Sequence, residues 1–513
     1  MKVSIIKPRW VVRGFHPDGS PEIQEDVAVA FSDGMICEIA PLDKINQKYA
    51  NSKINYHNEH ILTPGFVNSH HHLGLTPFQL GAPDLPLEIW FAARLGMRST
   101  NIYLDTLFSA FEMLSSGVTT VQHIQGWAAG DLENVYKSSK DVLRAYSDIG
   151  MRVSYCYALR EQNKFVYEDD DIFCAALPEQ IGKALSLNLA EHRVELEDYI
   201  QLFEHLFNDN QSKIARVQLA PANLHWMTDK GLLTLKEVSK KFNVPMHMHL
   251  LETPFQKEYA YQRTGTSAVN HLLRLGILGP DLTLGHGVWM TEEDIEIVAE
   301  TNTCVCHNCS SNFRLRSGTL PLMRLLSKNL RVGIGIDEAG INEDRDMLQE
   351  MRMALITHRT PGLAPGEVPS ADQILRMATE FGASTTAFRG SIGRLDPGKR
   401  MDALLFNYRS VTHPYQETNI PLVSVLIQRA KSKDIYQVYV DGELSYSDGK
   451  FIKVDRDHIL ELIAEDLSKN KTSAEIRSFA LATEVTPFVI DFYRDYLTHT
   501  SHRRPFYSAS SRD

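Results

Sequence analysis

The sequence predicts an α/β protein: a TIM-type (β/α)8 barrel, a small β-sandwich built from both chain ends, and a C-terminal helical tail. Between residues 63 and 390, short apolar strands alternate with helical stretches, which is typical of parallel β/α units. On either side of this region the chain consists mainly of strands and turns. Its 513 residues are enough for one large domain with additions.

Eight apolar segments are candidates for the barrel strands, and helical stretches such as 104–115, 195–206 and 291–300 lie between most of them. Eight such units in a region of this length are typical of a closed barrel, whose chemistry sits at the carboxyl ends of the strands. The candidate strands are Phe66–His72, Val118–Ile124, Arg152–Leu159, Ala215–Pro221, Pro245–Leu250, Leu282–Val288, Thr303–Cys309 and Arg331–Asp337.

The predicted sandwich combines residues 1–62 with residues 391–455. Neither segment alone buries much core, so we expect the two to pair. Residues 456–513 are expected to be helical at first and then irregular, with a mobile tail at 498–513. The strands expected in the sandwich are 3–6, 10–13, 26–31, 35–40, 402–406 and 438–444.

Composition excludes several classes of protein. The apolar share of 43% and charged share of 23% are ordinary for a globular chain. A net charge of −11 argues against a nucleic-acid partner. No apolar run suits a membrane span or a signal peptide, and six cysteines make no disulfide framework. We expect a cytoplasmic homodimer that acts on a small molecule, with no membrane or nucleic-acid partner.

Three consecutive histidines close the first strand candidate. Because side chains alternate along a strand, His70 and His72 point one way and His71 points the other. Two imidazoles on one face, at the carboxyl end of a strand, form half of a metal site.

Later strands supply the other half of this site. His249 ends the fifth strand candidate, His286 ends the sixth and Asp337 ends the eighth. In a closed barrel these ends converge on one cavity. Three imidazoles and a carboxylate suit Zn²⁺ or Fe²⁺, and water bound to such a cation ionises near neutral pH to become a nucleophile.

Two further residues are candidates for catalysis. Glu252 lies three positions after His249, where its carboxylate can fold back over the metal-bound water and carry protons. His286 is either a further metal ligand or a group that holds the hydroxide and stabilises developing charge.

Several residues near the strand ends are candidates for substrate contacts. Trp90 follows the histidine run and suits a flat ring, although lid packing is the alternative. Asn223, His225 and Trp226 follow the fourth strand and either contact substrate or pack within their loop. Glu338 follows Asp337, so strand alternation should point it off the metal. It either meets a cationic group of the substrate from the side or is solvated.

Together these motifs resemble the mononuclear-metal branch of the amidohydrolase superfamily. Within that branch the chain is most similar to triazine chlorohydrolases and to cytosine, guanine and adenosylhomocysteine deaminases. The resemblance extends from about residue 20 to residue 410. It is carried by His70-x-His72, His249-x-x-Glu252, His286 and Asp337, with support from the segments 87–90, 117–121, 309–312 and 392–403.

The resemblance implies a role for each of these residues. It implies that His286 touches the metal-bound water and the substrate, and that Glu252 moves protons. The dinuclear branches carry a carboxylated lysine at the end of the fourth strand, but that strand ends in Gln218–Asn223 here, without lysine. One metal per chain is therefore expected, zinc or alternatively iron. The implied ligands are His70, His72, His249 and Asp337.

The expected function is hydrolysis of a carbon–nitrogen bond, namely the deamination of an aminated N-heterocycle by metal-activated hydroxide. One alternative is hydrolysis of an acyclic amide or guanidine, or of a carbon–halogen bond, at the same site. Another is a catalytically silent binding or scaffold protein, which would have no need of the complete ligand set and Glu252.

Overall fold

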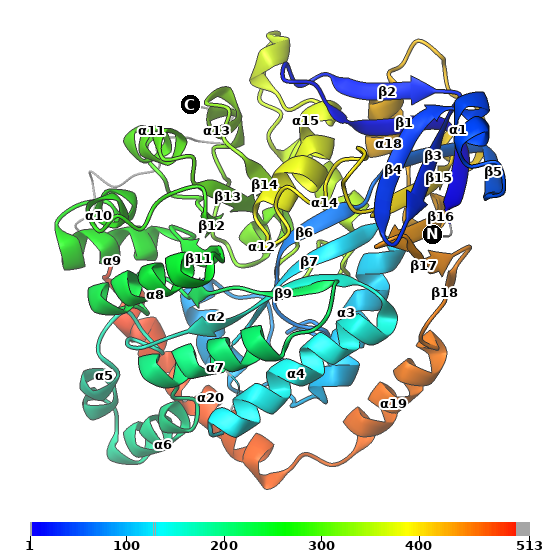
Figure 1. Ribbon diagram of the computed structural model, residues 1–513. Coiled ribbons are helices and arrows are strands. Elements are labelled where there is room, and N and C mark those ends of the chain that lie inside the picture. Colours follow the sequence, from blue (N-terminus) through cyan, green and yellow to red (C-terminus); the bar gives the residue numbers. More distant parts are fainter. Residues whose placement is uncertain (1–2, 127, 129, 499–513) are drawn as a thin grey trace.

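The computed structural model describes residues 3–126, 128 and 130–498, and parallel strands form its centre (Figure 1). One parallel sheet has the order β10-β8-β7-β6 with β9 paired to β8, and a second has the order β11-β12-β13-β14. These strands are β6 (Phe66–His71), β7 (Val118–Gln125), β8 (Arg152–Leu159), β9 (Ala215–Val217), β10 (Ala220–Pro221), β11 (Met246–Leu250), β12 (Leu282–His286), β13 (Cys304–His307) and β14 (Val332–Ile334).

Single parallel bridges join the two sheets at both edges. Leu219 pairs with Met246 and Asn223 with His249 at one join, while His71 pairs with Asp337 at the other. The predicted fourth strand is divided into β9 and β10, and between them the Gln218 amide donates to the Tyr155 carbonyl and the Leu219 amide to the Pro245 carbonyl. The result is a TIM-barrel-like α/β fold in which the first and eighth strands meet.

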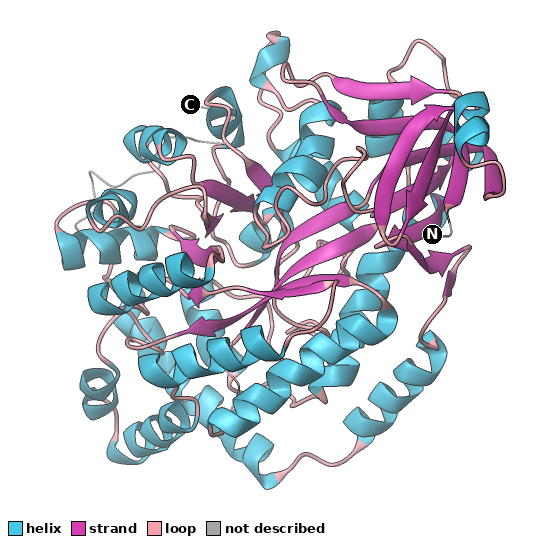
Figure 2. Ribbon diagram, in the orientation of Figure 1, coloured by secondary structure: helices cyan, strands magenta, loops and turns pink. Residues whose placement is uncertain are grey.

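Helices surround the parallel strands (Figure 2). They are α2 (Leu87–Arg94), α3 (Ile102–Ser115), α4 (Leu132–Ile149), α5 (Asp170–Ala176), α6 (Glu179–Glu191), α7 (Leu196–Asp209), α8 (Asp229–Phe242), α9 (Pro254–Thr264), α10 (Ala268–Arg274), α11 (Glu292–Glu300), α12 (Cys309–Arg314), α13 (Leu322–Ser327), α14 (Met347–Thr357), α15 (Ala371–Arg376) and α16 (Gly382–Ser384), with the short turns η1 (Pro365–Glu367) and η2 (Met377–Phe381).

Helix α4 illustrates how the sequence sets these helices. The Asp131 side chain accepts a hydrogen bond from the Asn134 amide at its start, and Gly150 ends it with a φ of 76°. Val135 and Val142 are buried on the face that meets the barrel. A cap at each end and a single apolar face are the local signals that specify such a helix.

The two chain ends form one mixed sheet of nine strands, in the order β18-β17-β16-β15-β5-β1-β3-β4 with β2 paired to β1. Strand β15 lies antiparallel to β5, which joins the N-terminal and C-terminal segments. The sheet comprises β1 (Ser4–Phe15), β2 (Pro21–Glu25), β3 (Val27–Ser32), β4 (Met35–Pro41), β5 (Lys53–Pro64), β15 (Ala403–Asn407), β16 (Ile435–Val440), β17 (Glu443–Ser447) and β18 (Lys450–Phe451). The two-layer sandwich and the domain boundaries at 62, 390 and 455 stay predictions.

The N-terminal strands differ from those predicted. The segments 3–6 and 10–13, expected as two strands, belong to the single strand β1, and β2 and β5 were not expected at all. Pro8 lies within β1, which shifts its register against β5 between Pro8 and Trp10. Such an irregularity tolerates a residue that has no amide hydrogen.

The remaining helices accompany the mixed sheet or follow it. They are α1 (Leu42–Lys48), α17 (Tyr408–Thr412), α18 (Leu422–Arg429), the turn η3 (Ser432–Asp434), α19 (Arg456–Ser468) and α20 (Ser473–Arg494). The Arg98 guanidinium bonds Glu475 of α20 at 3.0 Å, which ties the C-terminal helix to the segment after α2. Of the predicted mobile tail at 498–513, all but residue 498 lie outside the described residues.

No helix in the described part of the chain is both long and apolar enough to cross a bilayer. The cytoplasmic location and the dimeric state expected from the sequence stay predictions.

A buried ion network connects the barrel to the mixed sheet. Arg152 of β8 is fully buried, and its Nε and Nη2 atoms donate to the two Asp402 carboxylate oxygens at 2.7 and 2.9 Å. Its Nη2 also donates to Asp441 at 3.0 Å. Asp402 precedes β15, and Asp441 lies between β16 and β17. The network therefore couples three segments that are distant in the sequence.

We expect Asp402→Asn to lower the free energy of unfolding by about 3–5 kcal/mol, because it leaves the buried Arg152 charge incompletely paired. Urea denaturation would measure the change. As a control, Asp457→Asn removes an exposed carboxylate from a 3.5 Å pair with Arg456 and should change stability by less than about 1 kcal/mol. Equal effects of the two substitutions would contradict the coupling.

Candidate active site

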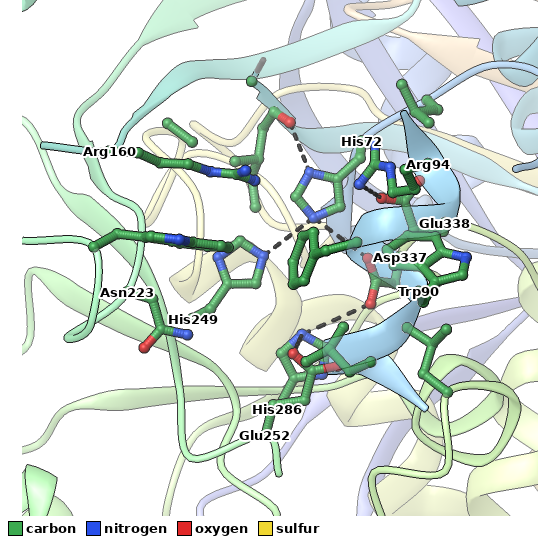
Figure 3. Close-up of a pocket in the computed structure, with 18 of the residues that line it drawn as sticks. His72, Trp90, Arg94, Arg160, Asn223, His249, Glu252, His286, Asp337 and Glu338 are labelled. Carbon is green, nitrogen blue, oxygen red and sulfur yellow. Dashed lines mark hydrogen bonds and ion pairs between the residues drawn. The ribbon is translucent and has the colours of Figure 1, made fainter. Parts of the chain in front are cut away.

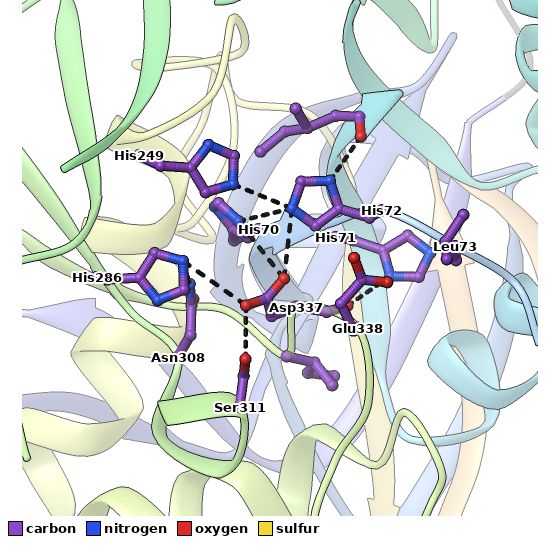
Figure 4. A network of polar contacts seen from close by, with 12 residues as sticks. His70, His71, His72, Leu73, His249, His286, Asn308, Ser311, Asp337 and Glu338 are labelled. Atoms are coloured by element: carbon purple, nitrogen blue, oxygen red, sulfur yellow. Dashed lines mark hydrogen bonds and ion pairs between the residues drawn. The ribbon is translucent and has the colours of Figure 1, made fainter. Parts of the chain in front are cut away.

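Four donor atoms meet at the carboxyl ends of the barrel strands (Figure 4). His70 and His72 belong to the end of β6, His249 to β11, and Asp337 follows β14. The Nε2 atom of His72 lies 3.0 Å from His70 Nε2 and 3.2 Å from His249 Nε2. Asp337 Oδ1 lies 3.3 Å from His72 Nε2 and 3.7 Å from His70 Nε2. The barrel thus brings together the four residues predicted as metal ligands.

The protonation of these rings suits a cation. His72 Nδ1 donates to the Ile124 carbonyl at 2.8 Å, and His249 Nδ1 donates to the Ala222 carbonyl at 2.9 Å. A carbonyl only accepts, so Nδ1 carries the proton in both rings and the lone pairs on Nε2 face each other. Burial lowers the pKa of His72 to about 4, so a second proton does not relieve the repulsion. The donor set fits a divalent metal ion.

Side chains behind the donors hold them in place. Ser311 Oγ donates to Asp337 Oδ2 at 2.7 Å, and His70 Nδ1 lies 2.8 Å from His247 Nε2. His71 points to the other side of its strand, where its Nε2 lies 3.2 Å from Ser109 Oγ. Hydrogen bonds of this kind orient a ligand and set its basicity.

His286 and Glu252 lie beside the donors. His286 Nδ1 donates to Asn312 Oδ1 at 2.9 Å, which turns Nε2 toward Glu252 Oε2 at 3.5 Å and Asp337 Oδ2 at 3.7 Å. Burial raises the pKa of Glu252 to about 7, although the nearby His286 lowers it. A carboxyl group with a pKa near neutrality exchanges protons readily in both directions.

The backbone conformation sets the direction of two of these side chains, His286 and Asp337. His286 has a φ of 72° and Asp337 a φ of 64°, both in the left-handed region that residues other than glycine rarely adopt. The chain therefore turns at Asp337, after the end of β14, and simple alternation of side chains no longer applies there. For this reason Glu338, which alternation predicted to point off the metal, also lines the cavity.

A cavity of about 80 Å³ opens in front of the donors (Figure 3). Of the predicted substrate contacts, Trp90, Asn223 and Glu338 line it. His225 does not: it is buried, with its ring centroid 4.3 Å from those of Tyr167 and Trp226. His225 therefore packs within its loop, which was the alternative to substrate contact. The next residue, Trp226, lines the cavity.

Glu338 is neither solvated nor unpaired. Its side chain is only 9% exposed, and Oε1 bonds Arg94 Nη1 at 3.1 Å. The Arg94 guanidinium also lies over the Trp90 ring, 4.7 Å from its centroid. A cationic group of a substrate would therefore share Glu338 with Arg94.

Trp226, a further candidate from the sequence, also lines the cavity, whereas sequence reasoning missed Phe91, Arg94, Gln125 and Arg160. One signal was available for Arg94. It lies four residues after Trp90 in the helix α2, and residues at this spacing share one helix face. Arg160 follows β8 directly, yet its approach to Trp226, with 3.8 Å between guanidinium carbon and ring centroid, depends on the loop after β10.

Comparisons with known proteins show the family of this chain. Residues 61–445 match the model of the amidohydrolase family. A 5-methylthioadenosine/S-adenosylhomocysteine deaminase from Thermodesulfovibrio yellowstonii is 27% identical over 448 residues, which cover 86% of this chain and 93% of the relative.

Two solved structures show the same fold. An adenosine deaminase from Xanthomonas campestris with bound zinc has a TM-score of 0.71 and 21% identity, with coverage of 90% of this chain and 97% of that one. The atrazine chlorohydrolase from Arthrobacter aurescens, complexed with zinc, has a TM-score of 0.73 and 18% identity, with coverage of 90% and 99%. The chain belongs to the amidohydrolase family, in its mononuclear-metal branch, and is a metal-dependent hydrolase that acts on carbon–nitrogen bonds.

Proposed function

We propose that this enzyme removes an exocyclic amino group from a flat, aminated N-heterocycle by hydrolysis, and that purine nucleosides are its substrate class. The observation that carries the proposal is Glu252, a buried carboxyl group with a pKa of about 7 beside the donor cluster. The relative from Thermodesulfovibrio yellowstonii is named as a deaminase of two such compounds, 5-methylthioadenosine and S-adenosylhomocysteine. The aromatic rings of Trp90, Phe91 and Trp226 provide faces that suit a planar ring.

We propose His70, His72, His249 and Asp337 as the ligands of one zinc ion, with iron as the alternative. Three imidazoles and one carboxylate are common ligands of either metal. When bound, the cation would act as a Lewis acid and lower the pKa of a water molecule toward neutrality. The fourth barrel strand offers no lysine, which supports a single ion.

Glu252 and His286 move the protons in this proposal. Neutral His286 presents an accepting Nε2, because its Nδ1 proton is held by Asn312. It can therefore take a proton from the attacking water and afterwards donate to the oxygen of the tetrahedral carbon. Protonated Glu252 gives its proton to a ring nitrogen, then takes the hydroxyl proton of the tetrahedral carbon and passes it to the leaving amine. The proton held by His286 returns to Glu252, whose Oε2 lies 3.5 Å from His286 Nε2, so that water and the aminated ring yield the oxo ring and ammonia.

Trp90, Asn223 and Glu338 remain the proposed substrate contacts, whereas His225 is withdrawn because it packs outside the cavity. Hydrolysis of a carbon–halogen bond is the second candidate, since an atrazine chlorohydrolase shares the fold. The complete donor set together with Glu252 argues against a catalytically silent protein.

Ammonia release tests the proposed reaction. The zinc-loaded enzyme should release ammonia from at least one of adenosine, 5-methylthioadenosine and S-adenosylhomocysteine, with guanine, cytosine and an aminotriazine completing the panel. Chloride release from a chlorotriazine, without ammonia from any compound, would instead support the second candidate.

Glu252→Gln should lower kcat by about 10² to 10⁴, because an amide cannot carry the proton. Its metal content should equal that of the unaltered enzyme, which separates proton transfer from metal binding. Steady-state kinetics and elemental analysis of the same preparation measure both quantities. Near-normal turnover would remove Glu252 from the mechanism.

His249→Ala should weaken metal affinity by more than about 100-fold, since loss of even a residue that supports a ligand costs 10- to 100-fold. Elemental analysis should find about one metal ion per unaltered chain. His205→Ala, which changes an exposed histidine of α7, is the matched control and should keep the metal. Two tightly bound ions per chain would contradict the single-metal site.

Glu338→Gln should raise KM about tenfold and leave metal content intact, because it removes the charge that pairs with Arg94 at the cavity wall. Glu296→Gln, which alters an exposed 3.2 Å pair with Lys328, is the control and should leave KM unchanged. If KM and kcat are both unaltered in Glu338→Gln, this carboxylate has no part in substrate binding.

A further inference from the structure

A second group of metal-ligating side chains lies outside the active-site cavity. It consists of His307 at the end of β13, Cys309 at the start of α12 and His358 directly after α14. One ligand atom of each residue lies within 4.8 Å of the ligand atoms of the other two. None of the three residues lines the active-site cavity. We call this separate group the β13 cluster.

The two imidazoles of the β13 cluster face each other. The Nε2 atoms of His307 and His358 are 2.9 Å apart, and the same atoms of His70 and His72 in the active site are 3.0 Å apart. Two nitrogens bound to one tetrahedral zinc ion lie about 3.3 Å apart, because each Zn–N bond is about 2.0 Å long. Small rotations of the side chains would therefore let one ion contact both rings.

Burial keeps these rings neutral. The exposed fraction is 1% for His307 and 7% for His358. Burial lowers the pKa of His307 and lowers that of His358 to about 4, so each ring keeps a lone pair for a ligand. The Nδ1 atom of His307 has no hydrogen-bond partner among the residues that the structure describes. The contact between the rings thus leaves one polar atom unsatisfied, a cost that coordination of a metal at Nε2 would offset.

Cys309 adds a sulfur donor to the β13 cluster. The side chain is 1% exposed, and its Sγ atom lies 3.3 Å from Thr357 Oγ1. Burial and the nearby Glu350 carboxylate raise the pKa of this thiol. A bound cation displaces the proton of a cysteine and holds the thiolate, and the negative charge of Glu350 favours a cation at the same place.

From this geometry we propose that His307, Cys309 and His358 form a second metal site, which binds zinc. Imidazole and thiolate are the usual ligands of zinc, and a water molecule would complete its four-fold coordination. The proposal goes beyond the proposed function, because it gives this ion no part in hydrolysis. With three protein donors, one of which must first lose a proton, the site should bind zinc more weakly than the active site. The purified enzyme should therefore still contain about one ion.

Zinc at the β13 cluster would hold the start of α12 in place. Cys309 is the first residue of this helix. Ser311 of the same helix donates to Asp337 at 2.7 Å. The next residue, Asn312, accepts a hydrogen bond from His286 at 2.9 Å. The second ion would thus stabilise the helix that orients two side chains of the active site, without touching the substrate.

Cobalt(II) distinguishes the two sites, because the four proposed ligands of the active site include no cysteine. The enzyme is first loaded with one equivalent of zinc, and Co²⁺ is then added in excess. About one Co²⁺ per chain should bind with a thiolate-to-cobalt charge-transfer band in the near ultraviolet, which nitrogen and oxygen donors do not give. Failure to see this band at about 1 mM Co²⁺, where a site with a Kd of that order is half filled, would overturn the proposal.

Two variants test the ligands of the cobalt ion. Cys309→Ser should abolish the charge-transfer band, and His358→Gln should weaken Co²⁺ binding by at least about tenfold. Cys156→Ser is the matched control for a buried cysteine and Cys37→Ser for an exposed one, and both should keep the band. A band that persists in Cys309→Ser, or that disappears in either control, would assign the cobalt to another thiol and overturn the proposal. The band does not depend on deamination, so failure of the proposed function leaves this test intact.

Discussion

The active site depends on one electrostatic constraint, the convergence of lone pairs at the end of the barrel. Three imidazole nitrogens and a carboxylate oxygen are linked by distances of 3.0 to 3.7 Å. The neighbouring strands impose this arrangement, because the carbonyls of Ile124 and Ala222 hold the Nδ1 protons and leave Nε2 facing inward. Only a cation at the centre relieves the repulsion, since burial keeps the rings neutral.

Closure of the ring of strands makes that convergence possible. The bridge from His71 to Asp337 joins the first strand to the eighth, and the bridge from Asn223 to His249 joins the two parallel sheets at the same end. Left-handed backbone at His286 and Asp337 then bends the chain at the rim of the cavity. Unusual backbone conformations of this kind concentrate at functional sites, where the surrounding fold supports their cost.

Charge varies along the active-site cavity and a larger cavity, of about 430 Å³, with which it shares part of its wall. The acidic groups Glu252 and Asp337 lie beside the imidazoles, Arg94 and Arg160 line both cavities, and Lys164 lines the larger one. Glu338 and Arg94 form an ion pair that links the acidic and the basic groups.

The sequence by itself placed the site residues at or shortly after the carboxyl ends of the strands, although β12, β13 and β14 end two or three residues earlier than predicted. His70, His72, His249, His286 and Asp337 could be placed at one rim because alternation along a strand and the common direction of parallel strands are local rules. Tertiary structure alone decided what the loops do. The packing of the loops places His225 among other side chains and turns Trp226 toward the active-site cavity. It also pairs Glu338 with Arg94 and places Lys164 in the wall of the larger cavity. Such contacts join segments far apart in the chain, so no local pattern encodes them.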